Sequence, residues 1–123
     1  GKENVFKGFD LASDAELNFK NKKYKIAAEL YEKAIEFNSE EIAYYDNAAN
    51  SYMKLGDNQK AIKLLLKAMN RLETIGKTEY LLAILYYDEG DNEKSCKYIL
   101  EAKAKKFDFP RGIEMLFCKY EYY

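Results

Sequence analysis

The stretch YMKLGDNQKAIKLLLKA, residues 52–68, decides the fold because a related stretch follows it. The sequence YYDEGDNEKSCKYILEA occupies residues 86–102, so the second copy starts 34 residues after the first, at 86 instead of 52. Both copies have an aromatic first residue, a central Gly-Asp-Asn and a final alanine. Recurrence at a fixed period of this length predicts a chain built from stacked structural repeats.

The spacing of apolar residues predicts helices along the whole chain. Apolar side chains recur every three or four residues, as at Leu30, Ala34 and Phe37, which is the period of an amphipathic helix. No stretch alternates apolar and polar residues for long enough to indicate a strand. We therefore expect an all-α fold.

Two glycines mark the turns inside the repeats. Gly56 and Gly90 each follow a helical pattern and precede Asp-Asn. Glycine readily adopts the left-handed conformation that ends a helix, and aspartate is a preferred N-cap. Each copy is thus expected to be a pair of helices joined by a tight turn.

At the same period the chain divides into units 8–41, 42–75 and 76–109, followed by a tail, 110–123. These units resemble the tetratricopeptide repeat family, whose 34-residue repeat has small residues at three fixed positions. Here those positions hold Ala15, Ala27, Ala34, Ala49, Ala61, Ala68, Ala83, Ser95 and Ala102. The resemblance implies a single domain, residues 1–123, that forms a right-handed helical-repeat solenoid of antiparallel helix pairs.

Large residues alternate with the small ones in this pattern and are expected to fill the space beside closely packed backbones. The first unit departs most from the family, with Asn18 where an aromatic residue is usual and Lys22 where a glycine is usual. Phe19, next to Asn18, is expected to replace the missing aromatic residue in part. The remaining large positions hold Leu11, Tyr24, Tyr31, Tyr45, Tyr52, Leu65, Leu82, Tyr86 and Ile99.

The tail is predicted to form a capping helix over residues 110–123. Pro110 can open it, because proline needs no backbone donor in the first turn. One face would carry an apolar set that covers the last repeat: Ile113, Leu116, Phe117 and Tyr120. The alternative is that tail aromatic residues, including Tyr122 and Tyr123, belong to a longer solenoid or a self-association surface.

Composition and charge exclude several classes of partner. Twenty basic residues nearly balance 21 acidic ones, so no net field is available to attract nucleic acid, and nucleic-acid binding is not expected. The longest apolar run, residues 80–87, is far shorter than a membrane span, and membrane insertion is not expected either. The chain begins with Gly1 instead of methionine, so an upstream segment can be missing and the compartment stays open, with the cytoplasm slightly favoured.

The two cysteines, Cys96 and Cys118, fit no metal-binding spacing. We expect two free, partly buried thiols, with a disulfide as the alternative.

No catalytic equipment is found in the sequence. There is no histidine to transfer protons near neutral pH, and the isolated glycines form no phosphate-binding loop. Glu40, Glu41 and Asp46 are expected on solvated helix faces instead of forming a catalytic pair. We predict a protein that is not an enzyme and that needs no cofactor or metal.

The resemblance implies a concave groove made by the first helix of each repeat, suited to a peptide or partner helix. Its first two repeats would be polar, whereas the third would be apolar. The groove is expected to be lined by Phe9, Glu16, Phe19, Asp46, Asn47, Asn50, Met53, Lys77, Tyr80, Leu81, Ile84 and Tyr87. Two alternatives stay open for the apolar part: an exposed ligand surface, or a surface covered by the C-terminal helix.

A protein or peptide partner follows from this resemblance, and we expect a scaffold or adaptor. One subgroup of the family binds acidic chaperone tails through a carboxylate clamp, whose five positions here hold Ala12, Glu16, Asn47, Lys77 and Leu81. Only Asn47 and Lys77 match, and Glu16 would repel a carboxylate, so no tight binding of such tails is expected.

Glu16 and Asp46 should instead favour a ligand with a basic residue. The alternative function is a structural or self-assembling element, a weak homo-oligomer formed through the aromatic tail.

Overall fold

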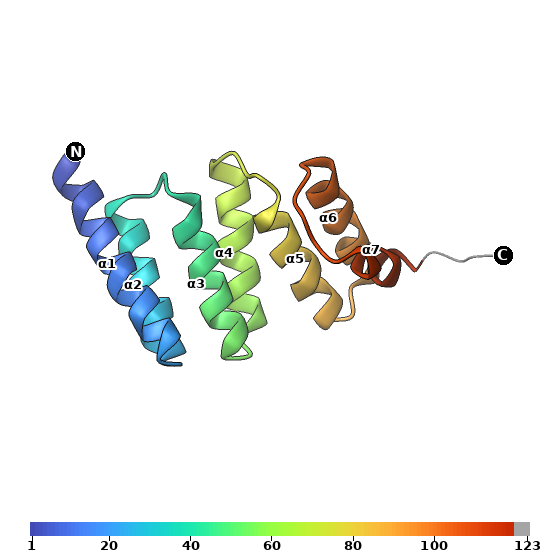
Figure 1. Ribbon diagram of the computed structural model, residues 1–123, viewed down its shortest axis with the longest axis horizontal. Coiled ribbons are helices and arrows are strands. Elements are labelled where there is room, and N and C mark those ends of the chain that lie inside the picture. The colour runs from blue at the N-terminus through green and yellow to red at the C-terminus, as the bar shows by residue number, and fades with distance from the viewer. Residues whose placement is uncertain (120–123) are drawn as a thin grey trace. The chain divides into compact units, whose positions relative to one another are not determined.

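The computed structural model describes residues 1–119, and helices are its only regular elements in that range (Figure 1). The all-α prediction is confirmed. The helices are α1 (Lys2–Lys20), α2 (Tyr24–Phe37), α3 (Ile42–Lys54), α4 (Asn58–Arg71), α5 (Lys77–Asp88), α6 (Asn92–Ala104) and α7 (Arg111–Cys118). The chain forms two compact units, the first from Gly1 to Leu72 and the second from Glu73 onward.

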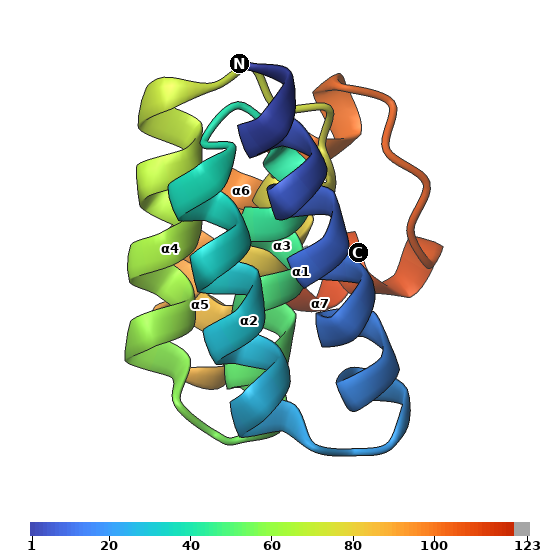
Figure 2. The same cartoon turned by 90° about the vertical axis from the view of Figure 1, so that its left-hand side faces the viewer.

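The first unit contains α1 to α4, in which α2 packs against both α1 and α3, and α3 packs against α4. Figure 2 shows α1 and α2 running side by side along this unit. The helix α1 starts at Lys2, before the predicted start of the first repeat at residue 8. Gly8 lies where α1 crosses α2, and a Cβ there would be 3.3 Å from the Ala34 carbonyl oxygen, so a small residue permits the close approach.

The small positions of the repeats are the most deeply buried part of the molecule. All nine, eight alanines and Ser95, have 0% of their surface exposed, as the repeat pattern predicts. Tyr45 and Leu65 are also fully buried beside them. The combination lets helix backbones approach closely while large side chains fill the remaining space.

The turns follow the predicted chemistry. Gly56 and Gly90 have φ angles of 77° and 82°, in the left-handed region that glycine tolerates best. Asp57 and Asp91 are the N-caps of α4 and α6, and their carboxylates accept hydrogen bonds from the backbone N–H groups of Lys60 and Lys94. In the first repeat Lys22 takes a left-handed φ of 63° where the family usually has glycine.

The second unit contains α5, α6 and α7. The segment that leads into α5 includes Gly76, whose φ is 105° and whose added Cβ would lie 2.5 Å from the Phe107 Cβ. Only glycine fits there without displacing Phe107. At the same end, the fully buried Glu79 receives hydrogen bonds from the Lys105 ammonium and the Thr74 hydroxyl, which ties the start of α5 to the end of α6.

The helix α7 begins at Arg111, with Pro110 as its N-cap. Phe117 is buried on its inner face, as predicted, whereas Leu116 is 53% exposed and does not join it. Tyr120, Tyr122 and Tyr123 lie outside the described residues, so the self-association surface stays a prediction.

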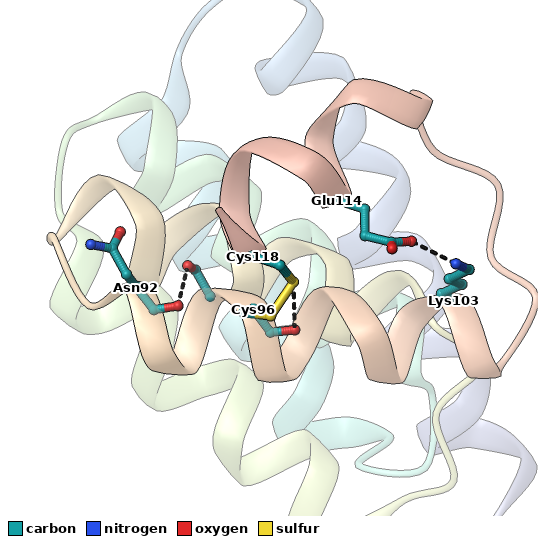
Figure 3. Close-up of a disulfide and its surroundings, with 6 residues drawn as sticks. Asn92, Cys96, Lys103, Glu114 and Cys118 are labelled. Carbon is teal, nitrogen blue, oxygen red and sulfur yellow. Dashed lines mark hydrogen bonds and ion pairs between the residues drawn. A yellow bond between two sulfur atoms is a disulfide. The ribbon is translucent and has the colours of Figure 1, made fainter. Parts of the chain in front are cut away.

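The prediction of free thiols was wrong: Cys96 of α6 and Cys118 of α7 form a disulfide (Figure 3). The two cysteines are 22 positions apart in the sequence, and the segment 105–110 between them folds back and brings their Cα atoms within 4.6 Å. Such a distance is typical of a disulfide. Sequence spacing alone could not reveal this return, because it depends on how α7 packs across α6.

Candidate functional site

Seven of the predicted groove residues lie in the first unit, and four of them meet around one pocket. Glu16 and Phe19 come from α1, and Asn47 and Asn50 come from α3. The two asparagines are three residues apart on a helix and therefore share one face. Lys20 of α1 and Tyr31 of α2 complete the lining of a pocket of about 460 Å³.

The apolar side of this pocket rests on the core of the first unit. Phe19 packs on a cluster that includes Ala15, Ala27 and the buried Tyr31. The ring of Phe19 also meets the Tyr24 ring edge to face, with centroids 5.1 Å apart. Phe19 thus packs between the core cluster and the Tyr24 ring and forms the apolar wall of the pocket.

The polar side combines one ion pair with two amides. Glu16 and Lys20 are joined at 3.2 Å, and both side chains are more than half exposed. Burial, and secondarily the negative charge of Glu16, raises the pKa of Tyr31 above its ordinary value of 10.0. Tyr31 therefore stays protonated at neutral pH. The asparagine side chains can both donate and accept hydrogen bonds.

The position of Asp46 contradicts two expectations from the sequence. It was predicted on a solvated helix face and in the groove as an attraction for basic ligands, but it is only 4% exposed. Its helix, α3, turns this residue toward the protein interior, so the carboxylate does not present its charge to a ligand in the way Glu16 does. Among the other predicted residues, Phe9 is 63% exposed and lies apart from the pocket lining, and Met53 is half-buried.

In the second unit, side chains from the C-terminal part of the same unit cover much of the predicted apolar surface. The Tyr80 ring packs against Phe107 and Phe109, with centroids 5.3 and 5.8 Å away. The Tyr87 ring stacks on Phe117 of α7, with centroids 4.4 Å apart. Of the two alternatives, coverage by the C-terminal helix is observed for Tyr87, whereas Tyr80 is covered by the segment that precedes this helix. Leu81 is buried, Ile84 is half-buried and Lys77 is exposed.

Sequence reasoning missed a pocket of about 320 Å³ on another face of the first unit. It is lined by Glu32, Tyr52, Lys60, Lys63, Leu64 and Lys67. The Tyr52 hydroxyl donates a hydrogen bond to Glu32, and the Lys60 ammonium lies 5.4 Å from the centre of the Tyr52 ring. The signal was present in the spacing of the three lysines along α4, which places them on one face.

It also missed a pocket of about 470 Å³ in the second unit, where the end of α6, the following segment and the start of α7 meet. Its lining includes Phe107, Phe109 and Arg111. This pocket depends on the return of the chain at residues 105–110, for which the sequence carried no recognised signal.

Among the helices of residues 1–119, none combines the length and apolar character needed to cross a membrane. In the same range, no three His, Cys, Asp or Glu side chains gather as a metal site requires.

Comparison with known proteins identifies the fold. Residues 43–76 match the family model described as tetratricopeptide repeat. A comparison with curated proteins finds no match.

Three solved structures share the fold at low sequence identity. The Arabidopsis OM64 TPR domain superposes with a TM-score of 0.86 at 18% identity, over 96% of this chain and 99% of that one. The Sgt2 TPR domain from Aspergillus fumigatus gives 0.77 at 18% identity, over 91% and 74%. The yeast Sti1 structure, a complex of its TPR2AB domain with pHSP90, gives 0.78 at 22% identity, over 91% of this chain and 48% of that one.

The predicted class, an all-α helical-repeat solenoid, is confirmed by these structures together with the buried small positions. The chain therefore matches the tetratricopeptide repeat in sequence at residues 43–76, and it shares the fold of solved TPR domains.

Proposed function

We propose that this chain is a non-catalytic protein-interaction module that binds an extended peptide segment in the pocket between α1 and α3. The observation that carries the proposal is the meeting of Glu16, Phe19, Asn47 and Asn50 around one pocket of about 460 Å³. The resemblance assigns these residues to the groove, and they come from α1 and α3. The Sti1 structure of the same fold, solved with pHSP90, supports protein binding as the class of function.

The chemistry of the pocket suits a peptide backbone with one apolar side chain. Asn47 and Asn50 offer donors and acceptors to backbone amides, which an extended segment leaves unpaired. Phe19 offers aromatic surface that already packs on the core cluster, so little conformational entropy is lost when a ligand packs on it.

Charge gives a modest preference among ligands. Glu16 is the carboxylate of this pocket, and its pairing with Lys20 in solvent reduces its attraction for a basic residue. We therefore propose a weak preference for a basic over an acidic side chain near α1. Acidic chaperone tails should bind poorly, because Ala12, Glu16 and Leu81 stand where clamp members carry polar or basic side chains.

The proposal predicts a localised loss of affinity. A peptide is selected from a random displayed library against the intact chain, and its affinity is measured by calorimetry. Asn50→Ala should weaken binding roughly three- to tenfold, the range expected when one net hydrogen bond is lost. The matched control is Asn70→Ala, because Asn70 is an exposed asparagine of α4 outside this pocket.

Equal affinities for Asn50→Ala and the unaltered chain, repeated with Asn47→Ala, would place the binding elsewhere. Circular dichroism of each variant confirms that the helices are retained.

A further inference from the structure

Side chains of Glu114, Phe117 and Cys118 attach the helix α7 to the rest of the second unit. Phe117 is 5% exposed, and its ring stacks on Tyr87 of α5 with an angle of 16° between the planes. Glu114 pairs with Lys103 of α6 at 2.8 Å, and Cys118 is bonded to Cys96 of α6 (Figure 3). The stack covers a predicted groove residue, Tyr87.

Without the disulfide, α7 is held by the Phe117 stack and one partly exposed ion pair. The helix has eight residues, and its N-cap Pro110 makes no side-chain capping bond; isolated helices of this length are marginal in water. Its C-cap, Lys119, has a left-handed φ of 52°, which is unfavourable for a residue with a Cβ. The Lys103 side chain is 62% exposed, so its ion pair contributes little.

The disulfide is therefore the strongest constraint on α7, and it can be broken chemically. Both cysteines are half-buried instead of fully enclosed in the core. A dithiol reductant attacks one sulfur as a thiolate, forms a mixed disulfide, and closes its own disulfide with its second thiolate. Cys96 and Cys118 gain two electrons and two protons as thiols, and the reductant is oxidised by the same two electrons.

We propose that the Tyr87 face of α5 is a docking site for a short amphipathic helix with an aromatic residue, and that α7 is its intrachain occupant while the Cys96–Cys118 disulfide is intact. Reduction frees the face for a partner helix of the same pattern. The ligand class is argued from α7 itself, which presents Phe117 to Tyr87 and places Met115 and Leu116 toward solvent. This surface lies in the second unit and does not depend on the pocket between α1 and α3.

The competition follows from effective concentration. While the disulfide is closed, α7 is presented to Tyr87 intramolecularly, and a separate helix has to displace it. After reduction only the segment 105–110 connects α7 to α6, and the local concentration of the occupant falls. A partner helix should therefore bind the reduced chain better than the oxidised chain.

Hydrogen exchange of the intact chain tests whether the disulfide holds α7. The oxidised chain is compared with the chain treated with a dithiol reductant and with the double variant Cys96→Ser, Cys118→Ser. Amides of α7 should lose protection at least tenfold in the reduced chain and in the double variant, while α1 to α4 stay unchanged. Equal protection of α7 in all three samples would overturn the proposal, as would failure of the disulfide to form in oxidised glutathione.

Binding in trans tests the docking surface. The probe is a fluorescent peptide of residues 109–119 that carries Cys118→Ser. It should bind the double variant at least tenfold more tightly than the oxidised chain, and a peptide with Phe117→Ala should lose this binding. The matched control is a peptide with Leu116→Ala, which should keep it because Leu116 is exposed on α7.

The docking site would be overturned if the peptide did not bind the double variant, or if the Phe117→Ala peptide bound as tightly as the unaltered one. Both readouts concern the second unit, so their failure is separable from failure of the proposed peptide pocket.

Discussion

Replacing Tyr45 with alanine is expected to lower the free energy of unfolding by about 3–5 kcal/mol, the range for removing a large aromatic side chain from a core. Tyr45 is fully buried, and it packs in the cluster formed by Ala34, Ile35, Tyr44 and Ala68. These residues belong to α2, α3 and α4, so the cavity would weaken the contacts of three helices at once.

Tyr45→Phe is the matched control for the ring. The Tyr45 hydroxyl donates a hydrogen bond to the Ser39 carbonyl oxygen at 3.1 Å, so its removal should cost only about 1 kcal/mol. Urea unfolding followed by circular dichroism measures both variants. If Tyr45→Ala costs no more than Tyr45→Phe, the ring is not the packing element described above.

The second large effect is expected at the buried ion pair of the second unit. Lys105→Met should lower the free energy of unfolding by about 2–3 kcal/mol, because it leaves the Glu79 carboxylate buried without its cation. We place the effect at the lower end for buried pairs, because the Lys105 side chain is 40% exposed and water screens part of the interaction. One Glu79 oxygen, Oε1, already lacks a hydrogen-bond partner among residues 1–119, so little compensation is available nearby.

The same pair gives stability a pH dependence. Burial raises the pKa of Glu79, but hydrogen bonds from Lys105, Thr74 and the backbone lower it more, and the net pKa lies below the ordinary value of 4.5. A carboxyl whose pKa is lower in the folded state contributes stability that is fully present above its unfolded pKa. This contribution should be lost as the pH falls from near 4.5 through the folded pKa.

A double-mutant cycle separates the pair from its surroundings. Adding Glu79→Gln to Lys105→Met removes the uncompensated charge and should restore part of the lost stability. The double variant should also lose less stability than the unaltered chain between pH 5 and pH 3. Additive losses with an unchanged pH profile would show that the two side chains do not act as a pair.

The sequence predicted the helix pairs because the responsible interactions are local. Small residues at fixed positions determine how closely backbones approach, and all nine are buried. Gly56 and Asp57 specify a left-handed turn and an N-cap within two residues. Lys22 shows the limit of this reasoning, since the tight turn between α1 and α2 has a left-handed φ at a residue that does not favour it.

The candidate site was predictable only where a helix face determines it. Asn47 and Asn50 share a face, and they reach the pocket with Glu16 and Phe19 as the repeat pattern indicates. Asp46 lies one position away and is buried instead. A residue at the border of a helix face is turned inward or outward by the neighbouring helix, which periodicity does not specify.

The disulfide could not be predicted from the sequence, and neither could the stacking of Phe117 on Tyr87. The reason is the same for both. Both depend on the direction that the chain takes after α6, through residues 105–110, before α7 starts at Arg111. The tail composition indicates an amphipathic helix, but it does not give the angle at which that helix crosses α6.

The central claim, a peptide-binding site between α1 and α3, is tested most directly by NMR. A labelled sample of the intact chain is titrated with the peptide selected from the random library, and backbone amide shifts are mapped. We expect the largest saturable shifts at Phe19, Asn47 and Asn50, around the pocket that they line. Shifts confined to the lysine-lined face of α4 or to the second unit, with these three amides unmoved, would contradict the claim.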